Sequence, residues 1–206
     1  MATIAVSPNR MELLRLKKKQ VVAERGHKLL KDKLEGLLQD FTEIVRRYQT
    51  LRREVDAEIA ELFKRFIMAS ASMPAPLYRA ALAFPECEAR LAMRERMIMN
   101  VHVPVFDFSI EGNMISYGID ETTSDLDDAM GALRETLQRM VELAEIEKTI
   151  ELVADEIERT RRRVNALEYV LIPQQADTIK YISAKLQELE RGNISRLMKI
   201  KDLVAM

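Results

Sequence analysis

Between residues 30 and 66, apolar side chains recur in alternating steps of four and three, which is the spacing of a coiled-coil seam. After one additional step of four, the repeat continues at Ile59, Leu62 and Phe66, and such a stutter locally unwinds a supercoil. A single helix cannot bury this stripe, so a second helix must cover it. The eight positions that define the repeat are Leu30, Leu34, Leu37, Phe41, Ile44, Tyr48, Leu51 and Val55.

A second apolar stripe runs through the C-terminal part of the chain. Its helix is expected to begin near Ser124, where Asp127 and Asp128 place negative charge in the first turn and complement the helix dipole. Pro173 cannot donate a hydrogen bond inside this helix, so we expect a kink near Pro173. The stripe then restarts at Ile179. Its seam positions before the proline are Ile150, Val153, Ile157, Val164, Leu167 and Leu171.

The segment between the two stripes has a different character. It contains four of the six prolines, which forbids one long helix. We expect short helices over residues 77–84 and 87–96, a strand over residues 97–108, a turn at Glu111-Gly112-Asn113 and a returning strand over residues 114–119. Pro104 favours an edge position in this sheet. The segment is expected to close the far end of the helical pair.

These elements predict a mainly α fold, a long antiparallel two-helix coiled coil with a small α/β hairpin module at one end. The expected parts are a first coiled-coil helix (residues 8–70, opened by Ser7-Pro8), the module (71–123) and a second helix (124–206). Closing the pair near Ser70 and Ser124 places Leu30 roughly opposite Val164. The last twenty or so residues then extend beyond the N-terminus.

Charge is balanced overall but segregated along the sequence. The net charge of −1 argues against nucleic-acid or membrane binding driven by overall charge. Residues 120–158 nevertheless hold thirteen acidic side chains and three basic ones, whereas the start of the first helix and the end of the second are basic. The single cysteine, Cys87, fits a reducing compartment. No apolar run is long enough for a bilayer, and we expect a soluble cytoplasmic protein.

No pattern typical of an enzyme is present. The chain lacks a phosphate-binding loop, a dinucleotide-binding glycine pattern, HExxH and paired metal-ligand cysteines. We therefore predict a non-catalytic protein with no cofactor and no metal site. A free-standing homodimeric coiled-coil scaffold or tether is the alternative from these patterns. A nucleic-acid-binding coiled coil is disfavoured, since the acidic half opposes it.

Three segments resemble the D subunit of the V-type and A-type rotary ATPases. They are Pro8-Asn-Arg-Met-Glu-Leu-Leu-Arg-Leu-Lys, Arg25-Gly-His-Lys-Leu-Leu-Lys-Asp-Lys and Thr160-Arg-Arg-Arg-Val-Asn-Ala-Leu-Glu-Tyr-Val-Leu-Ile-Pro173. Asn100-Val-His-Val-Pro-Val and Ser116-Tyr-Gly add a looser similarity in the middle segment.

The resemblance implies a central rotor shaft that enters the ring of catalytic A and B subunits. It also implies a small F subunit bound to the side of the shaft, a funnel-shaped subunit joining it to the membrane rotor ring, and a middle module that stimulates ATP hydrolysis. We hypothesise that Phe63, Ile67 and Val141 receive the F-like subunit. Expected contacts with the bearing of the A/B ring are Arg10, Lys17, Lys18, Lys19, Arg161, Arg162, Arg163, Arg196, Lys199 and Lys201.

Overall fold

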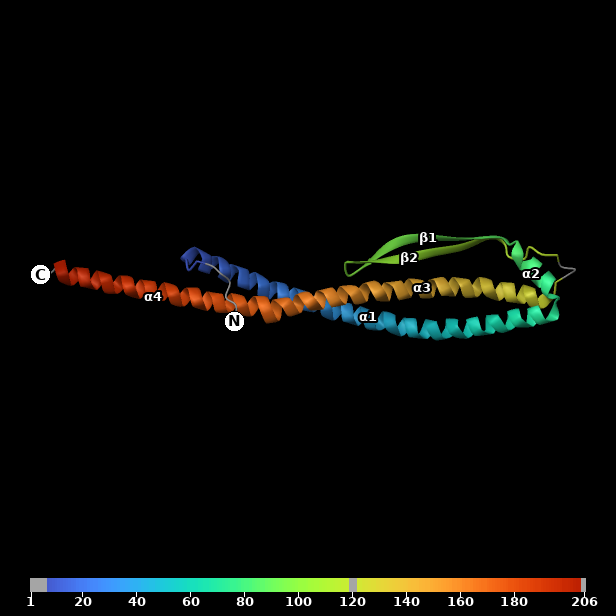
Figure 1. The fold of residues 1–206 in the computed structure, drawn as a ribbon, viewed down its shortest axis with the longest axis horizontal. Coiled ribbons are helices and arrows are strands. Elements are labelled where there is room, and N and C mark those ends of the chain that lie inside the picture. Colours follow the sequence, from blue (N-terminus) through green and yellow to red (C-terminus); the bar gives the residue numbers. More distant parts are fainter. Residues whose placement is uncertain (1–6, 119–121, 205–206) are drawn as a thin grey trace. The chain divides into compact units, whose positions relative to one another are not determined.

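The computed structural model describes residues 7–118 and 122–204. The chain divides into two compact units, of which unit 1 comprises residues 1–36 and 157–206 and unit 2 comprises residues 37–156. The predicted mainly α fold with one antiparallel hairpin is confirmed (Figure 1). In chain order the elements are α1 (Arg10–Ser72), α2 (Ala75–Ala83), β1 (Glu86–Ile98), β2 (Val101–Asn113), α3 (Ser124–Asn165), the π-helical segment η2 (Ala166–Leu171) and α4 (Ile172–Val204).

Helix α1 begins two residues after the proline that was expected to open it. The Met11 N–H donates to Asn9 Oδ1 at 3.3 Å, and the Leu13 N–H donates to the Asn9 carbonyl at 3.0 Å. Asn9 therefore caps the helix in place of Ser7, since asparagine is among the best N-cap residues.

In unit 2, α1 and α3 pack side by side in antiparallel directions (Figure 1). One buried cluster joins Leu51 and Val55 of α1 to Leu143 and Ile146 of α3. A second cluster, near the connection between the helices, joins Ala69 and Met73 to Leu126 and Met130. As the residue number rises along α1 it falls along α3, so the two apolar stripes of one chain bury each other.

The β hairpin differs from the sequence prediction. Residues 87–96 form most of β1 instead of a short helix, although Glu, Ala, Arg, Leu and Met are common helix formers. Ile98 pairs with Val101, so the turn is the two-residue Met99-Asn100, with φ of 43° and 69°. Positive φ at both positions is the geometry that connects tightly twisted strands. Residues 114–118 do not form the predicted returning strand.

Gly112 does not make the hairpin turn that its neighbours suggested. It lies in β2 opposite Cys87 with φ of +94°. A Cβ at this position would lie 2.3 Å from the Glu86 carbonyl oxygen. Glycine is therefore required here by a close approach of two backbones.

The hairpin runs back along α3, with β2 next to that helix, instead of capping the end of the helical pair (Figure 1). The Phe106 N–H donates to the Glu145 carboxylate at 2.8 Å. The backbone nitrogens of residues 104 and 106 point to the same edge of β2, because their direction alternates along a strand. Pro104 has no N–H that would remain unpaired at this edge. Pro104 thus lies in an edge strand, as its type predicted.

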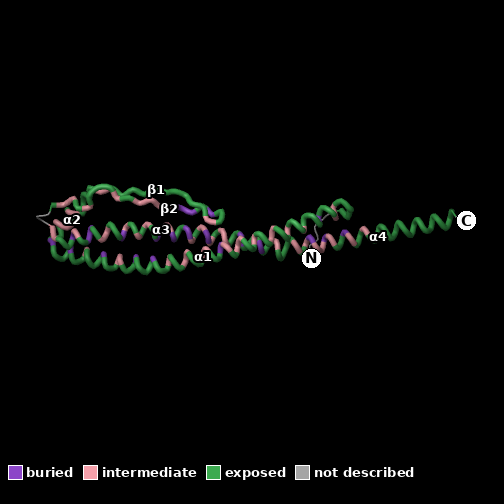
Figure 2. The backbone as a smooth tube through the Cα atoms, turned by 180° about the vertical axis from the view of Figure 1, so that it is seen from behind, coloured by how far each residue is buried: buried purple, intermediate pink, exposed green. Residues whose placement is uncertain are grey.

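In unit 1 the second stripe passes through a π-helical turn immediately before Pro173. The Ile172 N–H donates to the Leu167 carbonyl, five residues back. A proline ring clashes with the carbonyl four residues before it, so a widened turn at this place accommodates Pro173. Beyond it, Gln175, Thr178 and Ile182 are buried. All residues of 187–204 are exposed, as expected for an extension with no partner helix among the described residues (Figure 2).

Candidate interaction surfaces

The predicted seam positions are buried to different degrees. Leu37, Leu51, Val55, Val153 and Val164 are buried. Leu171 is the exception, since it is 40% exposed at the end of η2, where the π-helical turn changes the phase of the stripe. The remaining positions are half-buried: Leu30, Leu34, Phe41, Ile44, Tyr48, Ile150, Ile157 and Leu167.

Ion pairs flank the seam in unit 2. Arg47 contacts Glu142 at 2.6 Å, and Arg52 contacts Glu147 at 3.0 Å. Arg139 of α3 forms ion pairs with two carboxylates of α1, those of Glu54 and Glu58.

Tyr48 adds a hydrogen bond to this set, because its hydroxyl donates to Glu147 at 2.8 Å. This hydrogen bond, with partial burial, raises the pKa of Tyr48. The charged side chains therefore fix which residues of α1 face which residues of α3.

In unit 1 the register agrees with the prediction from the sequence. His27 Nε2 lies 3.3 Å from Glu168 Oε2, three residues before Leu30 and four residues after Val164. His27 is thus a contact between the two stripes.

The side chains predicted to contact a ring bearing all belong to unit 1. Lys17, Lys18 and Lys19 are exposed on α1, and Arg162 forms an ion pair with Glu158 on its own helix. The other exposed members of the set are Arg10, Arg161, Arg163, Arg196, Lys199 and Lys201. Apolar side chains lie among those of α4, including Leu197 at 65% and Ile200 at 56% exposed.

The residues predicted to receive an F-like subunit lie at two different positions along the helical pair of unit 2. Phe63 and Ile67 are 61% and 64% exposed on α1, while Val141 of α3 is half-buried. The ion pair of Arg139 with Glu54 places Val141 near that part of α1, about ten residues and roughly 15 Å from Phe63. Met68, 66% exposed one residue after Ile67, extends the apolar surface formed by Phe63 and Ile67 and was not among the predicted residues.

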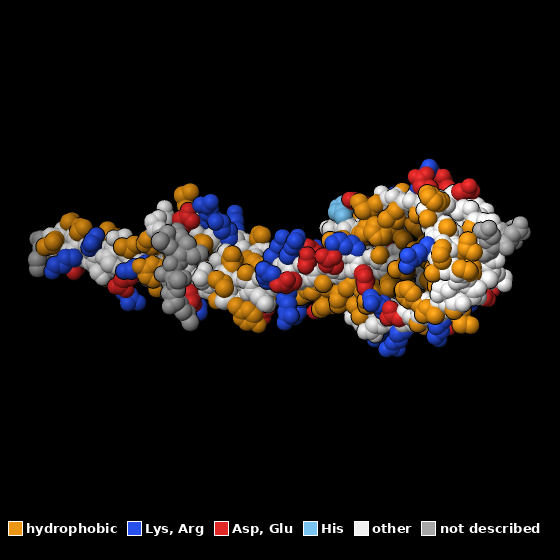
Figure 3. All heavy atoms as spheres, turned by 45° about the vertical axis from the view of Figure 1, so that its right-hand side comes forward, with side chains coloured by type: hydrophobic (Ala, Val, Ile, Leu, Met, Phe, Trp, Pro, Cys, Tyr) orange, Lys and Arg blue, Asp and Glu red, His pale blue; other side chains and the backbone are white. Residues whose placement is uncertain are grey.

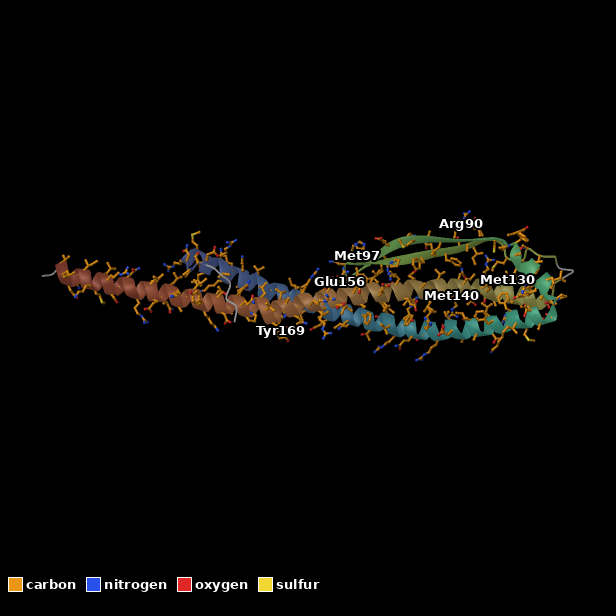
Figure 4. The ribbon with its side chains drawn as sticks, viewed as in Figure 1. Arg90, Met97, Met130, Met140, Glu156 and Tyr169 are labelled. Carbon is orange, nitrogen blue, oxygen red and sulfur yellow. The ribbon has the colours of Figure 1, made fainter. Side chains whose placement is uncertain are left out.

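The hairpin also presents charged and apolar side chains. Arg94 forms an ion pair with Asp107 across the strands, and this hydrogen bond lowers the pKa of Asp107. In Figure 4 Arg90 projects from β1 away from α3, and Met97 lies near the turn. Met93 and Met97 are 65% and 58% exposed. Figure 3 shows such apolar side chains among the charged ones on one face of the molecule.

Unit 1 contains a groove that the sequence did not reveal. It has a volume of about 410 Å³ and lies between α1 and the start of α4. Its lining residues are Arg15, Lys18, Lys19, Val22, Ala23, Leu171 and Gln175. Gln175 is 7% exposed, and its Oε1 has no hydrogen-bond partner among the described residues. Tyr169 of η2, which does not line the groove, points away from the helix and is 71% exposed (Figure 4).

The residues that most often carry catalysis or bind metals are dispersed. His102 Nδ1 lies 3.4 Å from Glu95 in the hairpin, while Cys87 is free and half-buried. No group of three or more potential metal ligands occurs among the described residues. In the same part of the chain, no helix combines the length and apolarity that crossing a membrane requires.

Two long apolar stripes that bury each other within one chain, with ion pairs along the seam, define an intramolecular coiled-coil protein. Residues 12–202 match the family model of the ATP synthase D subunit. The chain is 49% identical to the V-type ATP synthase D subunit of Acetivibrio thermocellus, over 99% of this chain and 94% of that protein. It is 48% identical to the D subunit of Clostridioides difficile, over 99% and 93% of the two chains. The corresponding protein of Fusobacterium nucleatum is 45% identical over 99% and 98%. The chain belongs to the D-subunit family of ATP synthases.

Proposed function

We propose that this chain is the central shaft of a V-type or A-type rotary ATPase. It couples ATP hydrolysis or synthesis in the A/B ring to rotation of the membrane ring that moves ions. The shaft is a non-catalytic structural subunit, and nucleotide chemistry belongs to the ring. It is cytoplasmic and peripheral to the membrane through the assembled complex. Its partners are the A and B subunits, the F subunit and the funnel-shaped subunit on the membrane ring.

The ion-paired seam of unit 2 is the observation that carries this proposal. A shaft transmits torque only if its two helices do not slide past each other. The contacts Arg47–Glu142 and Arg52–Glu147, together with Arg139 between Glu54 and Glu58, oppose sliding because each arginine would lose its partner on the other helix. The buried pair Val55 and Leu143 resists separation of the helices.

The hairpin supports an asymmetric shaft. It lies along α3 in unit 2, so that α1 and α3 present different surfaces (Figure 1). A ring subunit that contacts different surfaces at different rotor angles has its conformational equilibrium shifted differently at each angle. Rotation and the state of each catalytic subunit are thereby coupled.

The basic residues of unit 1 are the proposed bearing contacts. Diffuse charge contacts hold the shaft in the ring and let it turn without locking, because exposed ion pairs are individually weak. The test is to replace Lys17, Lys18, Lys19, Arg196, Lys199 and Lys201 by glutamine and to measure complex assembly and coupled activity at several salt concentrations. A matched control neutralises exposed cations of unit 2, such as Lys64, Arg79 and Arg90.

We expect the unit 1 variant to assemble less well, and the difference from the wild type to shrink as salt screens the wild-type contacts. Normal assembly and coupling of that variant at low salt would refute the bearing role. Native mass spectrometry tests the shaft itself. One copy with unlike subunits supports it, whereas a homodimer without them supports a free-standing scaffold.

For the F-like subunit, the exposed Phe63 and Ile67 are the stronger part of the proposed site, with Val141 as a separate contact. Replacing Phe63 and Ile67 by aspartate is expected to abolish recovery of that subunit in a pull-down. Replacing Phe84, which is 82% exposed after α2, is the control. Recovery of the F-like partner at full yield with the double variant would exclude this surface.

A further inference from the structure

We propose that the groove of unit 1 binds an acidic segment of a ring subunit, with one apolar side chain seated between α1 and the start of α4. This inference rests on the proposed function for the identity of the partner. The chemistry expected of the occupant follows from the side chains that line the groove.

The side of the groove formed by α1 has a regular pattern. Arg15, Lys18, Lys19, Val22 and Ala23 follow one another at helical spacing, so they share one face of the helix. The cations lie in the first half of this row and the apolar side chains in the second. Val22 is 68% exposed, and Leu171 on the opposite side is 40% exposed. An occupant therefore gains by bringing an apolar side chain between Val22 and Leu171.

The charges of the groove select an acidic occupant. Arg15 forms a surface pair with Glu12 at 3.3 Å, while Lys18 and Lys19 pair with none of the described carboxylates. Two adjacent cations beside an apolar floor favour carboxylates on either side of an apolar residue. Nucleic acid fits less well, because the floor offers no aromatic side chain for stacking.

Gln175 supplies an independent observation. It is buried, it lines the groove, and its Oε1 accepts no hydrogen bond from the described residues. Buried polar groups are normally paired, and an unpaired one destabilises the free chain. The terminal torsion of a glutamine side chain is broad, so this oxygen can turn toward an occupant. A backbone N–H or a hydroxyl of the bound segment is the donor that it lacks.

The first experiment separates a binding role of Gln175 from a structural one. The full chain carrying Gln175→Met is compared with the wild type for its midpoint of thermal unfolding and for its affinity for the ATPase subcomplex that lacks this chain. We expect a higher midpoint, because an unpaired polar atom is removed, and an affinity about three- to tenfold weaker. Thr178→Val is the control, since the buried Thr178 hydroxyl already donates to the Gln174 carbonyl at 2.7 Å. It should lower the midpoint and leave the affinity unchanged.

The second experiment identifies the occupant. A photo-crosslinking amino acid replaces Val22 in the assembled complex, and the neighbouring Val21, which does not line the groove, is the control position. The crosslinked peptide should come from a ring subunit and carry Asp or Glu within two residues of an apolar side chain. Lys18→Gln with Lys19→Gln should reduce this crosslink severalfold.

Several outcomes overturn the inference. A crosslink to a second copy of this chain or to lipid, a peptide without carboxylates, or equal yields from positions 21 and 22 each exclude the acidic segment. Unchanged affinity of the Gln175→Met chain excludes the hydrogen bond. Failure of the proposed function is distinguishable, because the wild-type chain then does not bind the subcomplex at all.

Discussion

The Phe106 N–H donates a 2.8 Å hydrogen bond to the Glu145 carboxylate, and this contact ties the β hairpin to α3. The donor lies on the edge of β2 that does not pair with β1, where a backbone N–H would otherwise remain free. A carboxylate is a strong acceptor for it. The hairpin is thus held at a defined place along α3 by a side chain of the helix.

We predict that Glu145→Leu loosens the hairpin without unfolding the helices. The variant leaves the Phe106 N–H without its acceptor, which costs about 1–3 kcal/mol where the group is shielded from water. Hydrogen exchange of the β2 amides should accelerate, while that of α1 stays unchanged. Glu151→Leu is the control, since the only ion pair of Glu151 with a described residue is that with Lys148, at 2.7 Å on the same helix. Equal β2 exchange in the two variants would contradict the tether.

The register of the helical pair predicts a charge-swap result. Arg47→Glu and Glu142→Arg should each destabilise the chain, because each brings two like charges together at a 2.6 Å contact. The double variant should recover part of the loss, with a coupling of about 0.2–1 kcal/mol, the usual range for exposed pairs. Chemical denaturation of all four proteins measures this coupling. Zero coupling at low salt would mean that the two side chains do not face each other.

Leu126 is fully buried in the cluster that joins the connection to both helices. Leu126→Ala removes apolar contacts and leaves a cavity, so the free energy of unfolding should fall by about 2–5 kcal/mol. Leu38→Ala provides the comparison, because Leu38 is 44% exposed and an exposed position typically changes stability by about 0.5 kcal/mol or less. Similar losses from both substitutions would show that this cluster is not a core.

Tyr117 predicts a change at alkaline pH. Burial, and then the hydrogen bond that its hydroxyl donates to Asp127 at 2.7 Å, raise the pKa of Tyr117. The folded chain holds this proton more tightly than the unfolded chain, whose tyrosine pKa is about 10. The stabilisation is therefore complete below about pH 10 and is lost as the pH rises toward the folded-state pKa.

Tyr117→Phe should cost about 1 kcal/mol at pH 7 through the lost hydrogen bond. Above pH 10, its free energy of unfolding should fall less steeply with pH than that of the wild type. Denaturant titrations between pH 7 and 11 measure both effects, with Tyr181→Phe, which removes an exposed hydroxyl, as the control for the substitution. Parallel curves for Tyr117→Phe and the wild type would oppose this assignment.

The hairpin was only partly predictable from the sequence. Pro104 signalled an edge strand, but the residues of β1 are common in helices, and Met99 is an unusual residue for a turn with positive φ. Gly112 suggested a turn, but glycine is needed at this position for the close approach to the Glu86 backbone. Pairing with β2 overrides the local preference of β1, and such pairing is not encoded in a window of a few residues.

The sequence by itself determined the long helices, their antiparallel pairing and its register, as the contact of His27 with Glu168 shows. A seam repeat is local and periodic, so the position of a residue in the repeat predicts the face of the helix on which it lies. Only the tertiary structure decided that the hairpin lies along α3 and that a π-helical turn precedes Pro173 and exposes Leu171. It also decided that Gln175 Oε1 is buried beside cations of α1 with no hydrogen-bond partner among the described residues. These features depend on which distant segments approach each other and on the space left between them. The spacing of residues along one helix predicts neither.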